Sequence, residues 1–310
     1  MTDGGDAAEK PLLIVASEVD TASMNIKKHF LDIVDAHRTE IKLWDNTVLK
    51  GRIAAGEFFL ATMRDEHVRH ENFDHEASQA IGTDFSAVVV FSRHRSASGK
   101  KSLTVHPPGN YGVAEYGGQE GTLVPSAPRY MTGAFLSLHE TGKEMVGDEY
   151  DITFEVTHHG PYVETPTFFI EIGSDEKAWR DKRAARVIAE TVASFAPTKD
   201  NKVAVGIGGG HYAPRFSELA LRKEISFGHM IPSYALEDST PEEIAGMVET
   251  ALSKTPGANG VYVHKKGLRG EARRKVREAL QILGINPLRS SEIPDRSIPD
   301  DSDISAAGKY

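Results

Sequence analysis

The sequence of 310 residues predicts an α/β protein in which helices cover both faces of a mixed, largely parallel β-sheet. Short apolar runs rich in β-branched residues, which are typical of buried strands, alternate with longer stretches of helical periodicity. No internal repeat and no linker divides the chain. We therefore expect residues 11–286 to form a single three-layer α/β/α domain, with a loop insertion near residues 107–130.

The predicted strands and helices follow one another along the chain. Strands are expected at residues 12–16, 41–44, 57–63, 85–91, 102–106, 151–157, 167–172, 202–207 and 260–264. Helices are expected at residues 22–34, 66–81, 131–141, 174–195 and 270–283. A further helix begins after Thr240, which can form a capping box with Glu243. The run FSAVVVF at 85–91 is the clearest strand signal, because β-branched residues dominate it.

The two ends of the chain depart from this pattern. Residues 1–10 are acidic and glycine-rich, without the basic and apolar regions of a signal peptide, and are expected to be a flexible extension. Residues 287–310, rich in Ser, Asp and Pro, are expected to be a mobile acidic tail. No apolar run approaches the roughly 20 residues that cross a bilayer, so we expect a cytoplasmic protein without a membrane partner.

Composition excludes several kinds of chemistry. The chain has no cysteine, which rules out disulfides, thiolate zinc sites and a cysteine nucleophile. The signatures GxSxG, HExxH and the Walker A loop are also missing. The glycine run at 206–210 follows a strand but lacks the GxGxxG register, because His211 stands where the last glycine would fall. It indicates close backbone approach to a substrate, with anion binding as the alternative.

Histidine is the residue that points to a site. Six of the 13 histidines lie at strand ends or in Gly/Pro-rich loops: His94, His106, His158, His159, His211 and His229. Ligands of open α/β sheets bind at such strand ends, so these imidazoles are expected to converge. They suit either a zinc site completed by a carboxylate or a general base with oxyanion donors. The carboxylate candidates are Glu155, which shares a strand face with Thr157, and Glu171, for which a strand-end salt bridge is the alternative.

His158 and His159 are adjacent, so both rings can face one pocket only where the backbone turns. The sequence Gly160-Pro161 directly after them can supply such a turn. A second group spaced for one helix face is His67, His70, Glu71, Asp74 and His75. For that group a solvated polar face is favoured over a metal site.

The net charge of −9 disfavours nucleic acid, but the charge is unevenly distributed. Residues 264–277 hold seven basic residues against Glu271 alone: Lys265, Lys266, Arg269, Arg273, Arg274, Lys275 and Arg277. This stretch is either a solvated helix face or a surface that binds phosphates.

Five segments together resemble a known family. They are SRHRS at 92–96, LTVHPPGN at 103–110, THHGP at 157–161, EIGS at 171–174 followed by Trp179, and GGHYAPR at 209–215. In this order they resemble the archaeal and plant type of D-aminoacyl-tRNA deacylase, from about residue 12 to about residue 283. The pairing of HHGP with GGHYAP is the most specific part of the resemblance.

The resemblance implies a phosphorylase/peptidyl-hydrolase-like fold, a Zn²⁺ requirement, and hydrolysis of the ester that joins a D-amino acid to tRNA. The catalytic candidates are His94, His158, His159, His211, Thr157 and Tyr212. The substrate-binding candidates are Ser92, His106, Asn110, Gly209, Gly210, Lys265, Lys266, Arg273 and Arg274. The metal candidates are His94, His159, His211 and Glu171. D-aminoacyl-tRNA is the expected partner and DNA is not. Whether the chain is a monomer or a homodimer stays open.

Two other functions use the same residues. A zinc-dependent peptidase or amidase of similar fold would employ the same histidines and carboxylates, but would not need the basic stretch at 264–277. A non-catalytic tRNA-binding module would keep that stretch and the glycine loop, but would not need His158 and His159.

Overall fold

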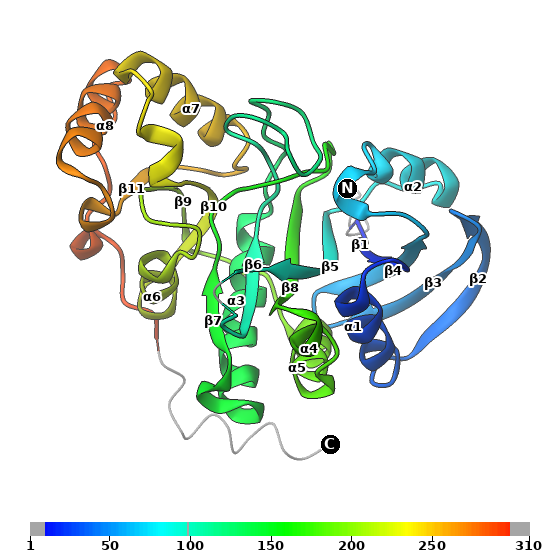
Figure 1. Ribbon diagram of the computed structural model, residues 1–310. Helices are drawn as coiled ribbons and strands as arrows, with labels where there is room; N and C mark the ends of the chain where they lie inside the picture. Colours follow the sequence, from blue (N-terminus) through cyan, green and yellow to red (C-terminus); the bar gives the residue numbers. More distant parts are fainter. Residues whose placement is uncertain (1–9, 98, 298–310) are drawn as a thin grey trace, which may run out of the picture.

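The computed structural model describes residues 10–97 and 99–297 and has the predicted α/β architecture, with strands in two sheets (Figure 1). The larger sheet has eight strands in the order β2-β3-β4-β1-β5-β8-β6-β7. These strands are β1 (Leu12–Ser17), β2 (Ala36–Leu43), β3 (Asn46–Ile53), β4 (Gly56–Met63), β5 (Ala87–Arg95), β6 (Ser102–His106), β7 (Asp151–Phe154) and β8 (Thr167–Ser174). The pairings of β2 with β3, β3 with β4 and β6 with β8 are antiparallel, and the others are parallel.

A second, smaller sheet of three parallel strands was not anticipated as a separate sheet. It consists of β9 (Lys202–Ile207), β10 (Ile225–Ile231) and β11 (Val261–Val263) in the order β10-β9-β11. Helices α7 (Pro241–Ser253) and α8 (Gly270–Ile282) pack on it around an apolar core of their own. Figure 1 shows this C-terminal part beside the β6–β7 end of the larger sheet.

Helices lie on both faces of the larger sheet. Helices α1 (Thr21–Leu31), α3 (Pro128–Met145), α4 (Glu176–Trp179) and α5 (Lys182–Ser194) share the core of one face. Helix α2 (Phe73–Ile81) packs on the other face, where Phe73 joins Val88 and Val90 of β5. Helix α6 (Pro214–Arg222) packs between β7 and β10. None of the helices within the described ranges is long and apolar enough to span a membrane.

Local sequence explains where several elements begin. Asp20 caps α1 by accepting a hydrogen bond from the backbone N–H of Ser23 at 2.9 Å. Thr240 and Glu243 form the predicted capping box of α7, in which each side chain accepts a backbone N–H of the other residue. The helix start at Thr240 is thus confirmed.

Two long predicted helices are each broken in two. The stretch 66–81 consists of the 3₁₀ helix η1 (His67–Arg69) and α2, because Asn72 between them takes a left-handed conformation with φ of 59°. The stretch 174–195 is α4 followed by α5, because Asp181 caps a new helix by accepting from the backbone of Arg183. Strands β3 and β10 and helix α6 were not predicted at all.

The prediction of a mobile tail is wrong for residues 288–296. Up to Arg296 the backbone packs against the smaller sheet and α6: Leu288 N–H donates to Val261, Glu224 N–H donates to the Pro294 carbonyl, and Arg296 N–H donates to Arg222. The 3₁₀ helix η5 (Ser290–Glu292) lies within this segment. Residues 298–310 and the predicted N-terminal extension up to residue 9 lie outside the described residues.

Candidate active site

One face of four neighbouring strands, β5, β8, β6 and β7, supplies the floor of the site. In the strand register Ser92 is paired with Glu171, and Phe169 is paired with His106. Because side chains alternate along a strand and paired residues share a face, Ser92, Glu171 and His106 point to the same side of the sheet. His94, two residues after Ser92, points there as well. The opposite side is filled by the apolar core under α3 and α5.

Glu155 continues this floor directly after β7, where its N–H donates to the Val105 carbonyl at 3.0 Å. The segment after β9 runs antiparallel beside it: Val156 N–H donates to the His211 carbonyl, and Ala213 N–H donates to the Phe154 carbonyl. This backbone pairing carries His211 from the smaller sheet to the buried carboxylate of the larger one.

His158 and His159 both turn their rings into the site, with ring centroids 4.5 Å apart. His159 takes a left-handed conformation with a φ of 45°, and the predicted Gly160-Pro161 pair directly after it has a cis peptide bond. The loop after β6 pairs with this bend, since Gly109 N–H donates to the His159 carbonyl at 2.7 Å.

Glu155 is completely buried, and three imidazoles surround its carboxylate. Its Oε2 lies 3.4 Å from His211 Nε2, 3.5 Å from His94 Nδ1 and 3.6 Å from His158 Nε2. Burial alone would raise the pKa of Glu155, but His211 and the other histidines outweigh it and lower the pKa. Conversely, Glu155 raises the pKa of His211 against the effect of burial. The position of Glu155 among these rings thus favours its charged form, and its carboxylate makes His211 easier to protonate.

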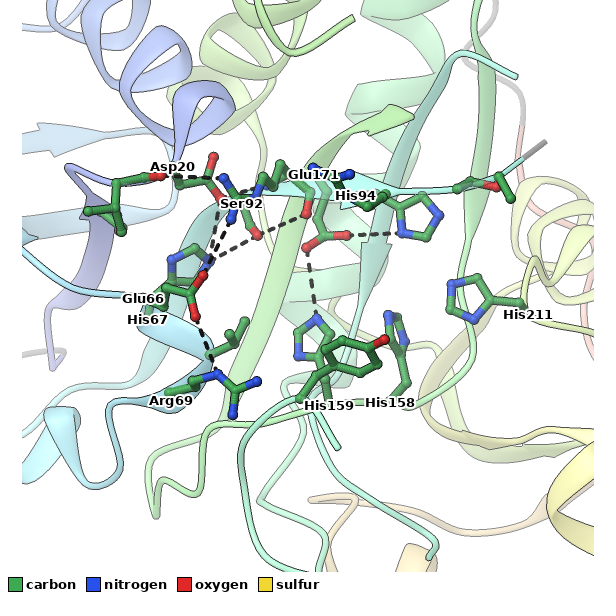
Figure 2. Close-up of a pocket in the computed structure, with 18 of the residues that line it drawn as sticks. Asp20, Glu66, His67, Arg69, Ser92, His94, His158, His159, Glu171 and His211 are labelled. Atoms are coloured by element: carbon green, nitrogen blue, oxygen red, sulfur yellow. Dashed lines mark hydrogen bonds and ion pairs between the residues drawn. The ribbon is translucent and has the colours of Figure 1, made fainter. Parts of the chain in front are cut away.

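Glu171 is the second buried carboxylate, and Figure 2 shows it between His94 and His159. Its oxygens lie 3.7 Å from His94 Nδ1, 3.6 Å from His106 Nε2 and 4.0 Å from His159 Nε2. Burial and the nearby charge of Glu155 raise the pKa of Glu171 to about 7. Glu171 can thus take up or release a proton near neutral pH.

His106, His158 and His159 are neutral at pH 7. Burial lowers the pKa of His159 to about 3 and that of His106 to about 4, and it lowers the pKa of His158 well below its usual value. The Nδ1 atoms of His158 and His159 lie 2.8 Å and 2.6 Å from the carbonyls of Val156 and Gly160. A neutral ring donates to such a carbonyl, so the lone pair of each ring is on Nε2, which faces the carboxylates.

A cavity of about 630 Å³ opens above these groups. Beyond the histidines it reaches Asp20, His67 and Arg93. His67 is buried, stacks on Phe169 with 5.6 Å between ring centroids, and places Nε2 2.9 Å from Ser92 Oγ. Asp20 lies 4.0 Å from that same nitrogen rather than from Nδ1, so the three residues do not form a catalytic triad.

The interpretation of residues 67–75 as a solvated helix face is wrong. Glu71 accepts the backbone N–H groups of Gly118 and Tyr162, and buried Asp74 accepts those of Glu164 and Thr165. These side chains anchor the loops around the cavity, and His67 lines it. The i, i+3, i+4 spacing concealed this, because it assumed a continuous helix.

The donor set fits a metal ion such as Zn²⁺. The ligand atoms of His94, Glu155, His158 and His211 all lie within 4.8 Å of one another. Neither oxygen of Glu155 has a hydrogen-bond partner among the described residues, which is costly for a buried carboxylate unless a cation is bound. The set expected from the sequence contained His159 and Glu171 in place of His158 and Glu155. Its four members do not form one such group in the part of the chain that the structure describes.

Several other residues predicted for the site stabilise the surrounding loops instead. The Thr157 hydroxyl accepts the Met230 N–H at 2.9 Å and lies 3.1 Å from His229 Nδ1, so both residues tie the loop to β10. His229 is buried within β10 and is not brought to the cluster. The Asn110 amide donates to the carbonyls of Gly117 and Gln119. Tyr212, in contrast, lines the cavity, and its buried hydroxyl has no partner within the described ranges.

The basic stretch joins the site through the glycine loop. Gly209 takes a φ of 103° and donates its N–H to Ser233 Oγ, which in turn donates to the carbonyl of Gly267. Lys265 and Lys266 lie on the 3₁₀ helix η4 (Lys265–Gly267) and have no ion pair in the described residues. On α8, Arg274 pairs with Glu278 at 2.8 Å and Arg273 donates to the Leu268 carbonyl.

The sheet topology and the buried histidine–carboxylate centre define an α/β protein with a buried site suited to a metal ion. Residues 81–288 match the family model described as D-aminoacyl-tRNA deacylase. The chain belongs to the D-aminoacyl-tRNA deacylase family, as the five segments indicated.

Curated relatives and a solved structure agree with this assignment. The chain is 34% identical to a D-aminoacyl-tRNA deacylase of Archaeoglobus fulgidus over 287 residues, which cover 91% of this chain and 97% of that protein. It is 36% identical to the one of Methanosarcina mazei over 295 residues, covering 94% and 96%. The crystal structure of a conserved protein of unknown function, AF0625, superposes with a TM-score of 0.80 at 32% identity and covers 94% of this chain and 100% of that one.

Proposed function

We propose that this chain hydrolyses the ester bond between a D-amino acid and the terminal ribose of tRNA, releasing free D-amino acid and tRNA. The observation that carries the proposal is the set of five imidazoles around the buried carboxylates of Glu155 and Glu171, in a chain of this family. An aminoacyl ester is already activated. A positioned water, a proton acceptor and an oxyanion donor therefore suffice, without a covalent intermediate.

We assign the pair of His159 and Glu171 as the proton acceptor. The neutral ring of His159 exposes the lone pair of Nε2 to the cavity and lies 4.0 Å from Glu171. A proton taken from the attacking water is stabilised by Glu171, whose raised pKa of about 7 suits acid–base exchange at neutral pH. The same proton is then donated to the ribose oxygen as it leaves.

Tyr212 is the residue we assign to the developing oxyanion. Its hydroxyl is buried, has no partner within the described residues, and belongs to a side chain that lines the cavity. The ring packs edge-on against His94 with 5.6 Å between centroids, which fixes its orientation. A preorganised donor of this kind stabilises the charge that appears as water adds to the ester carbonyl.

His94, Glu155, His158 and His211 are the residues that would hold Zn²⁺. When bound, the ion would polarise the ester carbonyl or lower the pKa of a water molecule. Tyrosine and histidine side chains around it would orient the substrate. Because the substrate is an aminoacyl-tRNA, we expect the protein to act in the cytoplasm, and Lys265 and Lys266 to contact tRNA phosphates.

Ester release from matched D- and L-aminoacyl-tRNA tests the proposal. We expect purified protein of measured zinc content to release the D-amino acid much faster than the L-amino acid. Chelation should abolish release, and re-addition of zinc should restore it. Peptide and amide substrates are assayed alongside. Peptide cleavage without ester release, or binding of tRNA with neither, would contradict the proposal.

A further inference from the structure

We propose that a second cavity, on the far side of the histidine cluster, holds the 3′-terminal nucleoside of the RNA, with the ring of Tyr234 stacked on its base. The inference rests on the proposed function for the nature of the substrate. It goes further by assigning the base of that nucleoside to Tyr234, which lies outside the segments that carry the family resemblance.

This second cavity has a volume of about 580 Å³ and shares four lining residues with the first: Tyr116, His158, His159 and His211. A scissile ester must reach these shared histidines, so the groups on its two sides extend into the two cavities. The first cavity is lined beyond the histidines by Asp20, Glu66 and Arg93. The second is lined by aromatic and apolar side chains, among them Tyr111, Tyr234 and Met247.

Two of the tyrosines present open ring surface. Tyr234 is 55% exposed and Tyr116 is 60% exposed, although both line the cavity. No ring contact ties either of them to another aromatic side chain in the described part of the chain. Exposed, unpartnered aromatic faces are the surfaces on which unpaired bases of single-stranded RNA stack. The 3′ end of tRNA is single-stranded, so its last base is available for this.

The backbone around Tyr234 is held in place by hydrogen bonds. These bonds link it to the glycine loop beside the histidines and to the basic stretch. It lies on the 3₁₀ helix η3 (Ser233–Leu236). Ser233 next to it accepts the N–H of Gly209 at 2.8 Å and donates to the Gly267 carbonyl. Lys265 and Lys266 belong to the same 3₁₀ helix as Gly267. A strand whose last base stacks on Tyr234 therefore has cationic side chains available for its preceding phosphates.

A thermodynamic cycle between protein and RNA tests the inference. Binding of uncharged tRNA is measured for intact tRNA and for tRNA lacking its 3′-terminal adenosine, with wild type, Tyr234→Ala and Tyr234→Phe. We expect truncation of the RNA to weaken wild-type binding about tenfold, as loss of one stacked base would. It should have little effect on Tyr234→Ala and the full effect on Tyr234→Phe, which keeps the ring. Ile282→Ala, which removes an exposed apolar side chain of α8 outside both cavities, should behave as wild type.

A second measurement reports stacking directly. tRNA carrying 2-aminopurine in place of the terminal adenine should lose fluorescence on binding wild type and Tyr234→Phe, but not Tyr234→Ala. Equal truncation effects in wild type and Tyr234→Ala, or unchanged fluorescence with wild type, would overturn the subsite. Neither readout depends on hydrolysis. A protein that stacks the base but leaves D-aminoacyl esters intact would refute the proposed activity and retain the subsite.

Discussion

Nε2 of His158 lies 3.6 Å from the Glu155 carboxylate, while Nδ1 of the same ring is held 2.8 Å from the Val156 carbonyl. The carbonyl contact fixes the tautomer and aims the remaining lone pair at the carboxylate. Metal-binding histidines are commonly oriented in this way by a hydrogen bond from their second nitrogen. The local backbone thus prepares His158 as a ligand, and Glu155 supplies the charge that a cation would neutralise.

Glu155→Gln is therefore predicted to weaken zinc binding by more than about 100-fold, since changes outside the ligand shell already cost 10- to 100-fold. Added zinc should raise the Tm of wild type, because a ligand that binds only the folded state stabilises it. It should leave the Tm of the variant unchanged. The control is Glu66→Gln, which removes a half-exposed carboxylate from the same cavity. Equal zinc content in both variants after dialysis would exclude Glu155 as a ligand.

His158→Ala and His159→Ala are predicted to lose at least about 100-fold in turnover for different reasons. His158→Ala should lose zinc. His159→Ala should retain zinc and lose the proton acceptor beside Glu171. Both variants should bind tRNA as wild type does, and exposed His75→Ala should match wild type throughout. Near wild-type turnover in either variant would make that histidine structural, and zinc loss from His159→Ala would reverse the two assignments.

The sequence predicted which segments meet, but not every residue that matters. The α/β fold, the convergence of His94, His158, His159 and His211, and the capping box at Thr240 follow from local patterns. Those patterns also indicated Glu155, because the alternation of side chains along a strand places it on the same face as Thr157. The sequence could not show, however, whether Glu155 or Glu171 is the metal ligand. That choice depends on how the residues after β7 pair with the 211–213 segment.

The role of His67 was beyond reach for a different reason. A single residue, Asn72, takes a left-handed conformation and ends the apparent helix, which separates His67 from α2 and buries it against Phe169. Helical spacing cannot reveal such an interruption. Similarly, β10 was missed because Gly228 and His229 read as a loop. There the close packing of Thr255 against Gly228, where a Cβ would lie 2.2 Å from its methyl carbon, requires glycine in a buried strand.

The pH dependence of stability should contain a contribution from His229. Burial lowers its pKa from 6.5 to about 4, despite the bond from Nε2 to the Val124 carbonyl. Between these two values the unfolded chain binds a proton that the folded chain does not, so stability falls as the pH decreases. Near pH 5.5 the slope should be smaller by about 1.2 kcal/mol per pH unit in His229→Gln than in wild type. Urea unfolding at several pH values measures how the free energy of unfolding changes with pH. Replacement of an exposed histidine, His37→Gln, is the control. Parallel curves for all three proteins would mean that His229 is protonated in the folded state.

The salt dependence of tRNA binding should depend on Lys265 and Lys266 more than on Arg274. The two lysines lie on η4 without an ion pair in the described residues, whereas Arg274 is already paired with Glu278 at 2.8 Å. Each phosphate contact releases counterions and contributes roughly 0.7 to 0.9 to the slope of log affinity against log salt. The double variant Lys265→Ala/Lys266→Ala should therefore lower the slope by about 1.5 and weaken binding of every tRNA alike. Arg274→Ala should change it by less than about 0.5, because the arginine must leave Glu278 to reach a phosphate. A slope that is unchanged in the double variant would make this stretch a solvated surface and move the tRNA contacts elsewhere.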